Sequence, residues 1–158
     1  MDVRAAQEED LDHLARVWYD GWQNAHARIV PAELARLRTF ESFRDRLAHA
    51  LRDTRVMGPP GNPVAFYILT GAELYQFYVS APARGSGVAG VLIAEAEARL
   101  AEAGVATAWL ACAIGNERAA RFYEKCRWQR VGTVISELDT VEGTFPLEVW
   151  RYEKALAP

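Results

Sequence analysis

Residues 73–104 constrain the fold most, because two regular patterns meet there at a cluster of glycines. The strand-like run ELYQFYVS comes first, and a helical pattern rich in leucine, valine and alanine follows it. Gly85, Gly87 and Gly90 lie between the two, in the sequence ARGSGVAG. Glycine lacks a Cβ and lets backbone amides approach a bound group, and the first amides of a helix favour an anion. This segment therefore predicts a strand, an anion-binding loop and a helix in succession.

Two known phosphate-binding motifs do not fit these glycines. The loop of nucleoside triphosphatases requires Gly-Lys-Ser/Thr, which does not follow here. The dinucleotide-binding fingerprint has another spacing and needs an acidic residue at the end of a second parallel strand. A pyrophosphate without a nicotinamide therefore remains a candidate for the bound anion.

The segments before the glycines predict mainly helices and then a hairpin. An apolar helical face runs from Leu11 to Trp22, Pro31 can open a short helix, and Thr39 can cap a third one. The sequence GPPGNP breaks this pattern, and the runs VAFYIL and ELYQFYVS follow it. These two runs are separated by Thr70-Gly71, which is typical of a hairpin.

The segments after the glycines predict alternating strands and helices. We expect the strand ATAWLACA, a helix from Glu117 to about Cys126, and the strands RVGTVI and LEVWRYEKAL around an acidic loop, ELDTVEGT. Together with the first half, this order favours an α/β layer structure whose sheet is partly antiparallel.

The amino-acid composition limits which binding partners and which cellular location we expect. A chain of 158 residues that is 51% hydrophobic is expected to form one domain, residues 1–158. Its net charge of −3 disfavours nucleic acid and anionic membranes as partners. The two cysteines are too few for a disulfide framework or a cysteine-built metal site, no export leader is recognised, and no apolar run approaches the ~18 residues of a membrane span. We therefore expect a cytoplasmic protein without a metal.

Two motifs, taken together, indicate a family. The first is Arg84-Gly85-Ser86-Gly87-Val88-Ala89, and the second is the helix of residues 116–128, with Asn116, then Ala119 and then Phe122-Tyr123. The pair resembles the GCN5-related N-acetyltransferase (GNAT) family from about Val3 to the C-terminus. The resemblance implies an acyl-CoA N-acyltransferase fold, with a V-shaped, mixed and mostly antiparallel sheet of six or seven strands and helices on both faces.

The resemblance also implies a binding site for acetyl-CoA. Its pyrophosphate is expected on the backbone amides of Gly85, Ser86, Gly87, Val88, Ala89 and Gly90, with Arg84 adding positive charge. Its pantetheine arm is expected between the strands ELYQFYVS and ATAWLACA, where backbone groups near Phe77 and Val79 bind it and Asn116 contacts it. A strand amide freed by the separation of these strands would bind the acetyl oxygen.

Two side chains are candidate catalytic residues by the same resemblance. Tyr123 is expected to protonate the departing thiolate, and Glu73 or a water chain to remove the proton of the amine. If Glu73 is instead an exposed acid at a strand end, it has no such role. Strict alternation would place Glu73 on the same face as Phe77 and Val79, unless a β-bulge intervenes.

One residue departs from the family pattern. The family usually has a glycine at the end of this helix, where the present chain has Arg127. Either Arg127 adopts the left-handed conformation at a cost of about 1 kcal/mol, or the helix ends in another way.

The resemblance thus implies an N-acetyltransferase, in which we expect a primary amine to attack acetyl-CoA directly in a ternary complex. A non-catalytic acyl-CoA sensor and an interaction domain remain alternatives. The acceptor can be a small molecule or a peptide amine, and a homodimer is compatible with the family. Acidic residues at 73, 137, 139 and 142 favour a cationic acceptor. We expect His26 to be a surface or packing residue, Cys112 to be a buried structural thiol, and the arginines at 36, 38, 44 and 46 to coat a solvated face.

Overall fold

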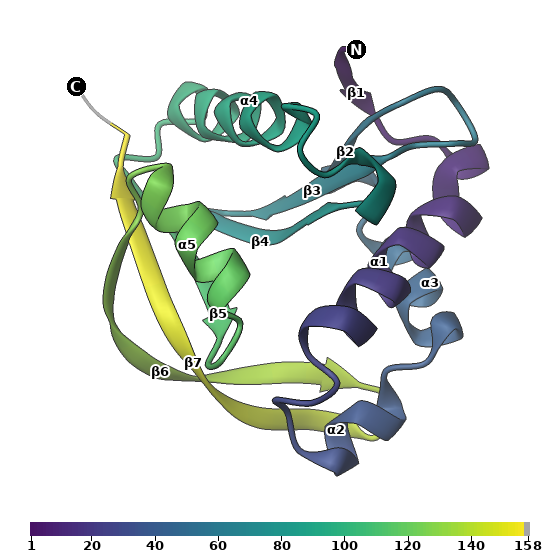
Figure 1. Cartoon of the computed structure of the whole chain (residues 1–158), viewed down its shortest axis with the longest axis vertical. Coiled ribbons are helices and arrows are strands. Elements are labelled where there is room, and N and C mark those ends of the chain that lie inside the picture. Colours follow the sequence, from purple (N-terminus) through teal and green to yellow (C-terminus); the bar gives the residue numbers. More distant parts are fainter. Residues whose placement is uncertain (157–158) are drawn as a thin grey trace.

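The computed structural model describes residues 1–156 and contains a seven-stranded sheet with the strand order β1-β2-β3-β4-β5-β7-β6 (Figure 1). All neighbouring strands are antiparallel except β4 and β5, which are parallel. The predicted mixed, mostly antiparallel sheet is therefore confirmed. The strands are β1 (Val3–Ala5), β2 (Thr54–Met57), β3 (Ala65–Thr70), β4 (Glu73–Val79), β5 (Thr107–Ala113), β6 (Gln129–Thr140) and β7 (Gly143–Ala155).

Helices cover both faces of the sheet (Figure 1). They are α1 (Leu11–Ala25), α2 (Ala32–Leu37), α3 (Phe40–His49), α4 (Val88–Glu102) and α5 (Glu117–Lys125). The side chains of β3 alternate between two cores: Ala65 and Tyr67 pack with α4 and α5, whereas Phe66 and Ile68 pack with α1 and α3. None of these helices is long and apolar enough to cross a membrane, as far as residues 1–156 are concerned.

Most predicted elements are confirmed, and two differ. Strand β2 was not predicted, because its four residues follow the third helix after only a short 3-10 turn and leave no alternating pattern to recognise. The expected acidic loop is mostly strand, since β6 continues to Thr140 and β7 begins at Gly143. Thr140 closes this tight hairpin, because its hydroxyl accepts from the amide of Glu142 (3.1 Å) and donates to the carbonyl of Gly143 (2.6 Å).

Strands β4 and β5 separate after a single point of contact. Glu73 faces Trp109, and the amide of Trp109 donates to the carbonyl of Ala72 at 3.1 Å. No further residue pair of the two strands is in register within the described chain. Strand β4 pairs with β3, and β5 pairs with β7, so each keeps one edge without a strand partner. The sheet is therefore open between them.

A β-bulge changes which side chains of β4 face each core. Ile68 is opposite Gln76 and Leu69 is opposite Leu74, so that Tyr75 is the extra residue of β4. Phe77 and Val79 pack on the α4 and α5 side, as does Leu74 before the bulge. Tyr75 and Tyr78 pack on the opposite side, against α1 and α3. The strict alternation considered for β4 is therefore wrong.

The residue that departs from the family pattern, Arg127, lies just after the C-terminal end of α5. Arg127 has a φ of 71° and is the one non-glycine residue with a positive φ in the described chain. The amide of Trp128 donates to the carbonyl of Tyr123 (2.9 Å), and the amide of Arg127 donates to that of Glu124 (3.0 Å). These two bonds form a Schellman motif, whose left-handed residue is usually glycine. Arg127 thus keeps the helix end at a conformational cost.

We expect Arg127→Gly to raise the free energy of unfolding by about 1 kcal/mol, because glycine adopts the left-handed conformation without steric cost. Chemical denaturation measures this change. Arg127→Ala is the control, since alanine retains the Cβ and should give little or no gain. Equal stabilisation by both variants would show that the arginine side chain, and not the backbone, is the source of the effect.

Candidate active site

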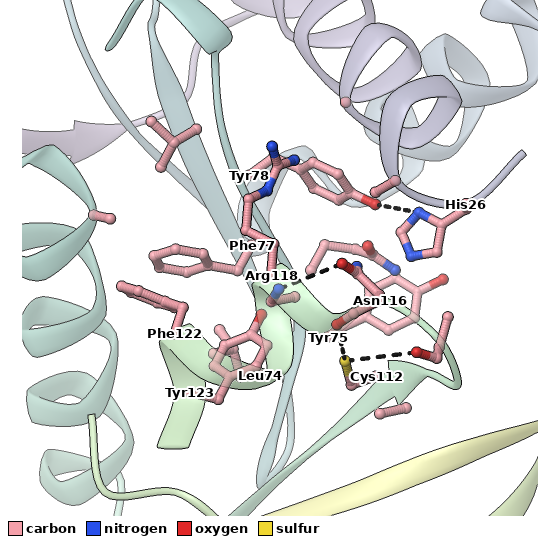
Figure 2. A pocket seen from close by; sticks show the side chains of 18 of the residues that line it. His26, Leu74, Tyr75, Phe77, Tyr78, Cys112, Asn116, Arg118, Phe122 and Tyr123 are labelled. Carbon is pink, nitrogen blue, oxygen red and sulfur yellow. Dashed lines mark hydrogen bonds between the residues drawn. The ribbon is translucent and has the colours of Figure 1, made fainter. Parts of the chain in front are cut away.

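The opening between β4 and β5 forms a cavity of about 230 Å³ (Figure 2). Its walls come from β4, β5, the C-terminal half of α1, the N-terminal end of α4 and one side of α5. Six of the residues predicted from the sequence line it together: Phe77, Val79, Arg84, Ala89, Asn116 and Tyr123. The other loop residues that were predicted, 85–88 and 90, do not line the cavity itself but lie between and beside Arg84 and Ala89.

The glycine loop presents free backbone amides. Gly85 and Gly87 have φ angles of 79° and 89°, which other residues adopt only with strain. Ser86 donates its amide to the carbonyl of Ala83 at 3.3 Å, whereas the amides of Gly85 and of residues 87–90 have no acceptor within residues 1–156. A Cβ built at Gly85, Gly87 or Gly90 would meet no atom within 4 Å, so the space beside the loop is open. This arrangement fits an anion of phosphate type.

Two arginines make the region beside this loop positive. Burial, and after it the nearby charge of Arg118, lowers the pKa of Arg84. Both arginines line the cavity, and neither has a carboxylate within 4.0 Å among the described residues. Arg118 was not singled out from the sequence, because only the turn that Asn116 starts brings it next to Arg84.

Asn116 begins α5 and faces the cavity. Its Oδ1 accepts from the amide of Ala119 at 3.3 Å and so caps the helix, which leaves its NH₂ group available as a donor. The neighbouring thiol of Cys112 is buried, as expected, and burial raises its pKa to about 12. Cys112 is therefore a thiol at neutral pH and not an acyl-carrying nucleophile.

The hydroxyl of Tyr123 points into the cavity (Figure 2). The ring is held edge-on by Phe77, Phe122 and Trp128, with centroids 5.6–6.4 Å away. Burial raises the pKa of Tyr123 above its ordinary value near 10. The hydroxyl is therefore protonated at any physiological pH and can donate to a group bound in the cavity.

A second cavity, of about 110 Å³, adjoins the first on the α1 and α3 side of the sheet. The two share six lining residues, which are His26, Tyr75, Gln76, Tyr78, Ala111 and Ala113. Glu73 lines the second cavity and not the first. Burial raises the pKa of Glu73 to about 7, against the opposing charge of Arg151. A carboxylate with this pKa can accept a proton near neutral pH.

His26 stands where the two cavities meet. Its ring stacks on Trp22 with centroids 5.6 Å apart, and its Nδ1 lies 3.4 Å from the hydroxyl of Tyr78 (Figure 2). Burial lowers the pKa of His26 to about 4, so the ring is neutral at physiological pH. It is a packing residue, as expected, but one whose ring also lines both cavities.

Comparison with known proteins identifies the fold. Residues 61–127 match the model of the Acetyltransferase (GNAT) family, which confirms the resemblance over this part of the chain. An N-acetyltransferase of Staphylococcus aureus Mu50 is 20% identical with a TM-score of 0.73, and the alignment covers 99% of this chain and 98% of that one. A GCN5-related N-acetyltransferase of Rhodopseudomonas palustris is 20% identical with a TM-score of 0.75, covering 98% and 94%. The chain has the GNAT fold.

A third GNAT-fold structure was solved with a ligand. The PaiA N-acetyltransferase of Thermoplasma acidophilum, in complex with coenzyme A, is 18% identical with a TM-score of 0.66, and the alignment covers 98% of each chain. No curated protein sequence matches the chain. Within residues 1–156, no group of three or more His, Cys, Asp or Glu residues could hold a metal ion.

Two arginines that were expected to be solvated line the second cavity instead. Arg36 and Arg44 are exposed and paired with Glu142 and Asp12, as expected for a surface. Arg38 and Arg46 instead line the second cavity, so the prediction is wrong for these two. Their inward orientation follows from how α2 and α3 pack, which the alternation of charges in the sequence does not reveal.

The acidic wall expected for the acceptor pocket is not present. Ser136 and Leu138 of β6 line the second cavity, and strand alternation turns Glu137 and Asp139 to the outside. Glu142 is exposed and bound to Arg36. Glu73 is therefore the one acidic side chain that lines this cavity in the described chain.

The raised pKa of Glu73 predicts how Glu73→Gln changes stability with pH. The folded protein holds the Glu73 proton up to about pH 7, whereas the unfolded chain releases it near the ordinary value of 4.5. The stability that this proton contributes is thus complete below pH 4.5 and is lost as the pH rises towards 7. Because glutamine cannot lose a proton, Glu73→Gln should become progressively more stable than the wild type over this interval.

Unfolding by urea at a series of pH values measures the difference. Glu148→Gln, which removes an exposed carboxylate on β7, is the control and should show no such pH-dependent gain. A constant difference between Glu73→Gln and the wild type from about pH 4 to pH 8 would mean that Glu73 is not desolvated.

Proposed function

We propose that residues 1–158 form a single N-acetyltransferase domain that transfers an acetyl group from acetyl-CoA to a primary amine by direct attack in a ternary complex. The observation that carries this proposal is the pair of adjoining cavities at the opening between β4 and β5. Tyr123 borders one and Glu73 the other, and residues shared by both lie between them. A thioester and an amine could therefore meet from opposite faces of one sheet.

The proposed cofactor site combines the free amides and the arginines. The amides of Gly85 and of residues 87–90, with Arg84 and Arg118, suit the pyrophosphate of acetyl-CoA, in part because the backbone there is unobstructed, whereas the amide of Ser86 is bonded to Ala83. The free edge of β4 near Phe77 and Val79, together with Asn116, suits the pantetheine arm. The coenzyme A bound to the Thermoplasma protein of the same fold supports this choice of ligand.

Glu73, Tyr123 and the open backbone edge of β4 would together catalyse the acetyl transfer. Glu73 takes a proton from the protonated amine, and the neutral nitrogen then attacks the thioester carbonyl carbon. A free amide of the β4 edge donates to the carbonyl oxygen, where negative charge develops. As the carbon–sulfur bond breaks, the hydroxyl of Tyr123 donates to the leaving sulfur, and the proton that the nitrogen loses on becoming an amide restores this hydroxyl. Because burial raises the pKa of Tyr123, its hydroxyl still holds a proton when the sulfur leaves.

Two alternatives predict different results with acetyl-CoA. A non-catalytic acyl-CoA sensor would bind it but release no thiol with any amine, and an interaction domain would not bind it. The position and raised pKa of Glu73 favour an enzyme, because a sensor needs no proton acceptor near neutral pH. A cytoplasmic location and a homodimer remain predictions of the sequence and its resemblance.

Gly90 gives a clean test of the cofactor site. Its backbone is helical and a Cβ there meets no atom within 4 Å, so substitution should not disturb the fold. Acetyl-CoA should raise the melting temperature of the wild type, because a ligand that binds only the folded state stabilises it. Gly90→Glu should abolish this rise through charge repulsion, whereas Gly90→Gln, of matching size, should retain most of it. Equal shifts in both variants would exclude the loop from the site.

Tyr123→Phe tests the proton donor. The ring and its packing remain, so the affinity for acetyl-CoA should be nearly unchanged, while the turnover number should fall by about 10²-fold. Turnover at saturating substrates and the dissociation constant of acetyl-CoA are measured on one preparation. Tyr152→Phe is the control, because it removes a nearby hydroxyl that bonds Glu124 and Arg130 instead of facing the cavity. If Tyr123→Phe binds acetyl-CoA and turns over at the wild-type rate, Tyr123 is not the proton donor.

A further inference from the structure

Arg38 and Arg46 present two guanidinium groups to the second cavity. Arg38 follows α2, is only 3% exposed, and donates from Nη1 to the carbonyl of Asp139 at 2.8 Å. Arg46 lies on α3, stacks 4.3 Å above the ring of Trp18, and donates from Nη2 to the hydroxyl of Tyr75 at 2.9 Å. Both side chains are thus held in place by the protein.

Neither guanidinium has an anionic partner in the described part of the chain. No carboxylate lies within 4.0 Å of Arg38 or Arg46, in contrast to Arg36 and Arg44 outside the cavity. Burial, and after it the charge of Arg46, lowers the pKa of Arg38 to about 10. Two like charges that are held near each other, with Arg38 buried and Arg46 half-buried, are unfavourable until an anion joins them. A bound anion would offset this cost.

The rest of the cavity is mainly apolar. Its walls include Trp18, Trp22, Leu34, Leu138, Leu147 and Val149. Glu73, the proposed acceptor of the amine proton, lines the same cavity. The cavity therefore offers one place for an amine, one for an anion and an apolar wall for the carbon skeleton between or beside them.

We propose that the acceptor is an α-amino acid with an apolar or aromatic side chain, whose carboxylate is bound by Arg38 and Arg46. Arginine suits a carboxylate because its planar donors match the two oxygens. This proposal rests on the acetyl transfer proposed above and replaces the cationic acceptor suggested by the sequence. It also disfavours the N-terminus of a peptide, in which the α-carboxylate has become an amide.

Three matched acceptors test the role of the carboxylate in the wild-type enzyme. L-phenylalanine, L-phenylalaninamide and 2-phenylethylamine share a ring and a primary amine, and only the first has the carboxylate. Thiol release from acetyl-CoA should give a kcat/KM for L-phenylalanine that is on the order of 10²-fold above the other two, because they leave the buried Arg38 and the half-buried Arg46 without a carboxylate. Equal or faster turnover of the amide or the amine would overturn the proposal.

Arg46→Gln assigns the effect to the arginines. The ratio of kcat/KM for L-phenylalanine to that for its amide should fall by at least about 10-fold, because only L-phenylalanine has a carboxylate for Arg46 to bind. This ratio would not move if Arg46 only stabilised the fold. Arg44→Gln, on the same helix but outside the cavity, is the control and should keep the wild-type preference. If Arg46→Gln keeps the wild-type preference, Arg46 does not bind the acceptor carboxylate.

A binding measurement separates this proposal from the proposed transfer reaction. L-phenylalanine without acetyl-CoA should raise the melting temperature of the wild type, and the amide should raise it less. If this difference appears but no acceptor releases thiol, the anion site is correct and the transfer reaction is wrong. If thiol is released equally with all three acceptors, the transfer reaction is correct and the anion site is wrong.

Discussion

The candidate site depends on the separation of β4 from β5 after their single contact at Glu73 and Trp109. A continuous pairing would satisfy the backbone groups of both edges and close the cavity. An open edge is unfavourable unless water or a ligand satisfies it, so other contacts must maintain the opening. Helix α1 approaches so closely on one side that a Cβ at Gly21 would lie 2.7 Å from the ring of Tyr78. On the other side, the cap of Asn116 fixes the start of α5.

Burial around this opening sets the protonation of several groups at once. It raises the pKa of Glu73 to about 7 and lowers that of His26 to about 4. It also raises the pKa of Tyr123. At neutral pH the cavity walls therefore combine a carboxyl group that can gain or lose a proton, a neutral imidazole and a phenol that keeps its proton. One property of the fold, its low exposure to water, thus prepares both a proton acceptor and a proton donor.

Local patterns in the sequence predicted most of the elements and the glycine loop before α4, because cap residues, glycines and apolar spacing act over a few neighbours. Thr39 caps α3 and Gly87 takes a left-handed φ at the start of α4, as such residues do. The second cavity could not be predicted in this way. The bulge at Tyr75 and the inward orientation of Arg38 arise from packing between distant segments. The acidic segment between β6 and β7 was expected to be a loop, so the strand alternation that turns its charged side chains outward was not predicted. The negative charge that residues 137, 139 and 142 were expected to give the second cavity is therefore absent from its described lining.

The central claim is that the opening between β4 and β5 binds acyl-CoA. Amide hydrogen exchange with and without acetyl-CoA tests it most directly, because the claim concerns backbone amides that lack a partner. The account predicts slower exchange at residues 85–90 and along the free edge of β4 from Tyr75 to Val79, with little change at the β6 and β7 hairpin. Protection confined to another part of the chain, or no protection at saturating acetyl-CoA, would contradict it.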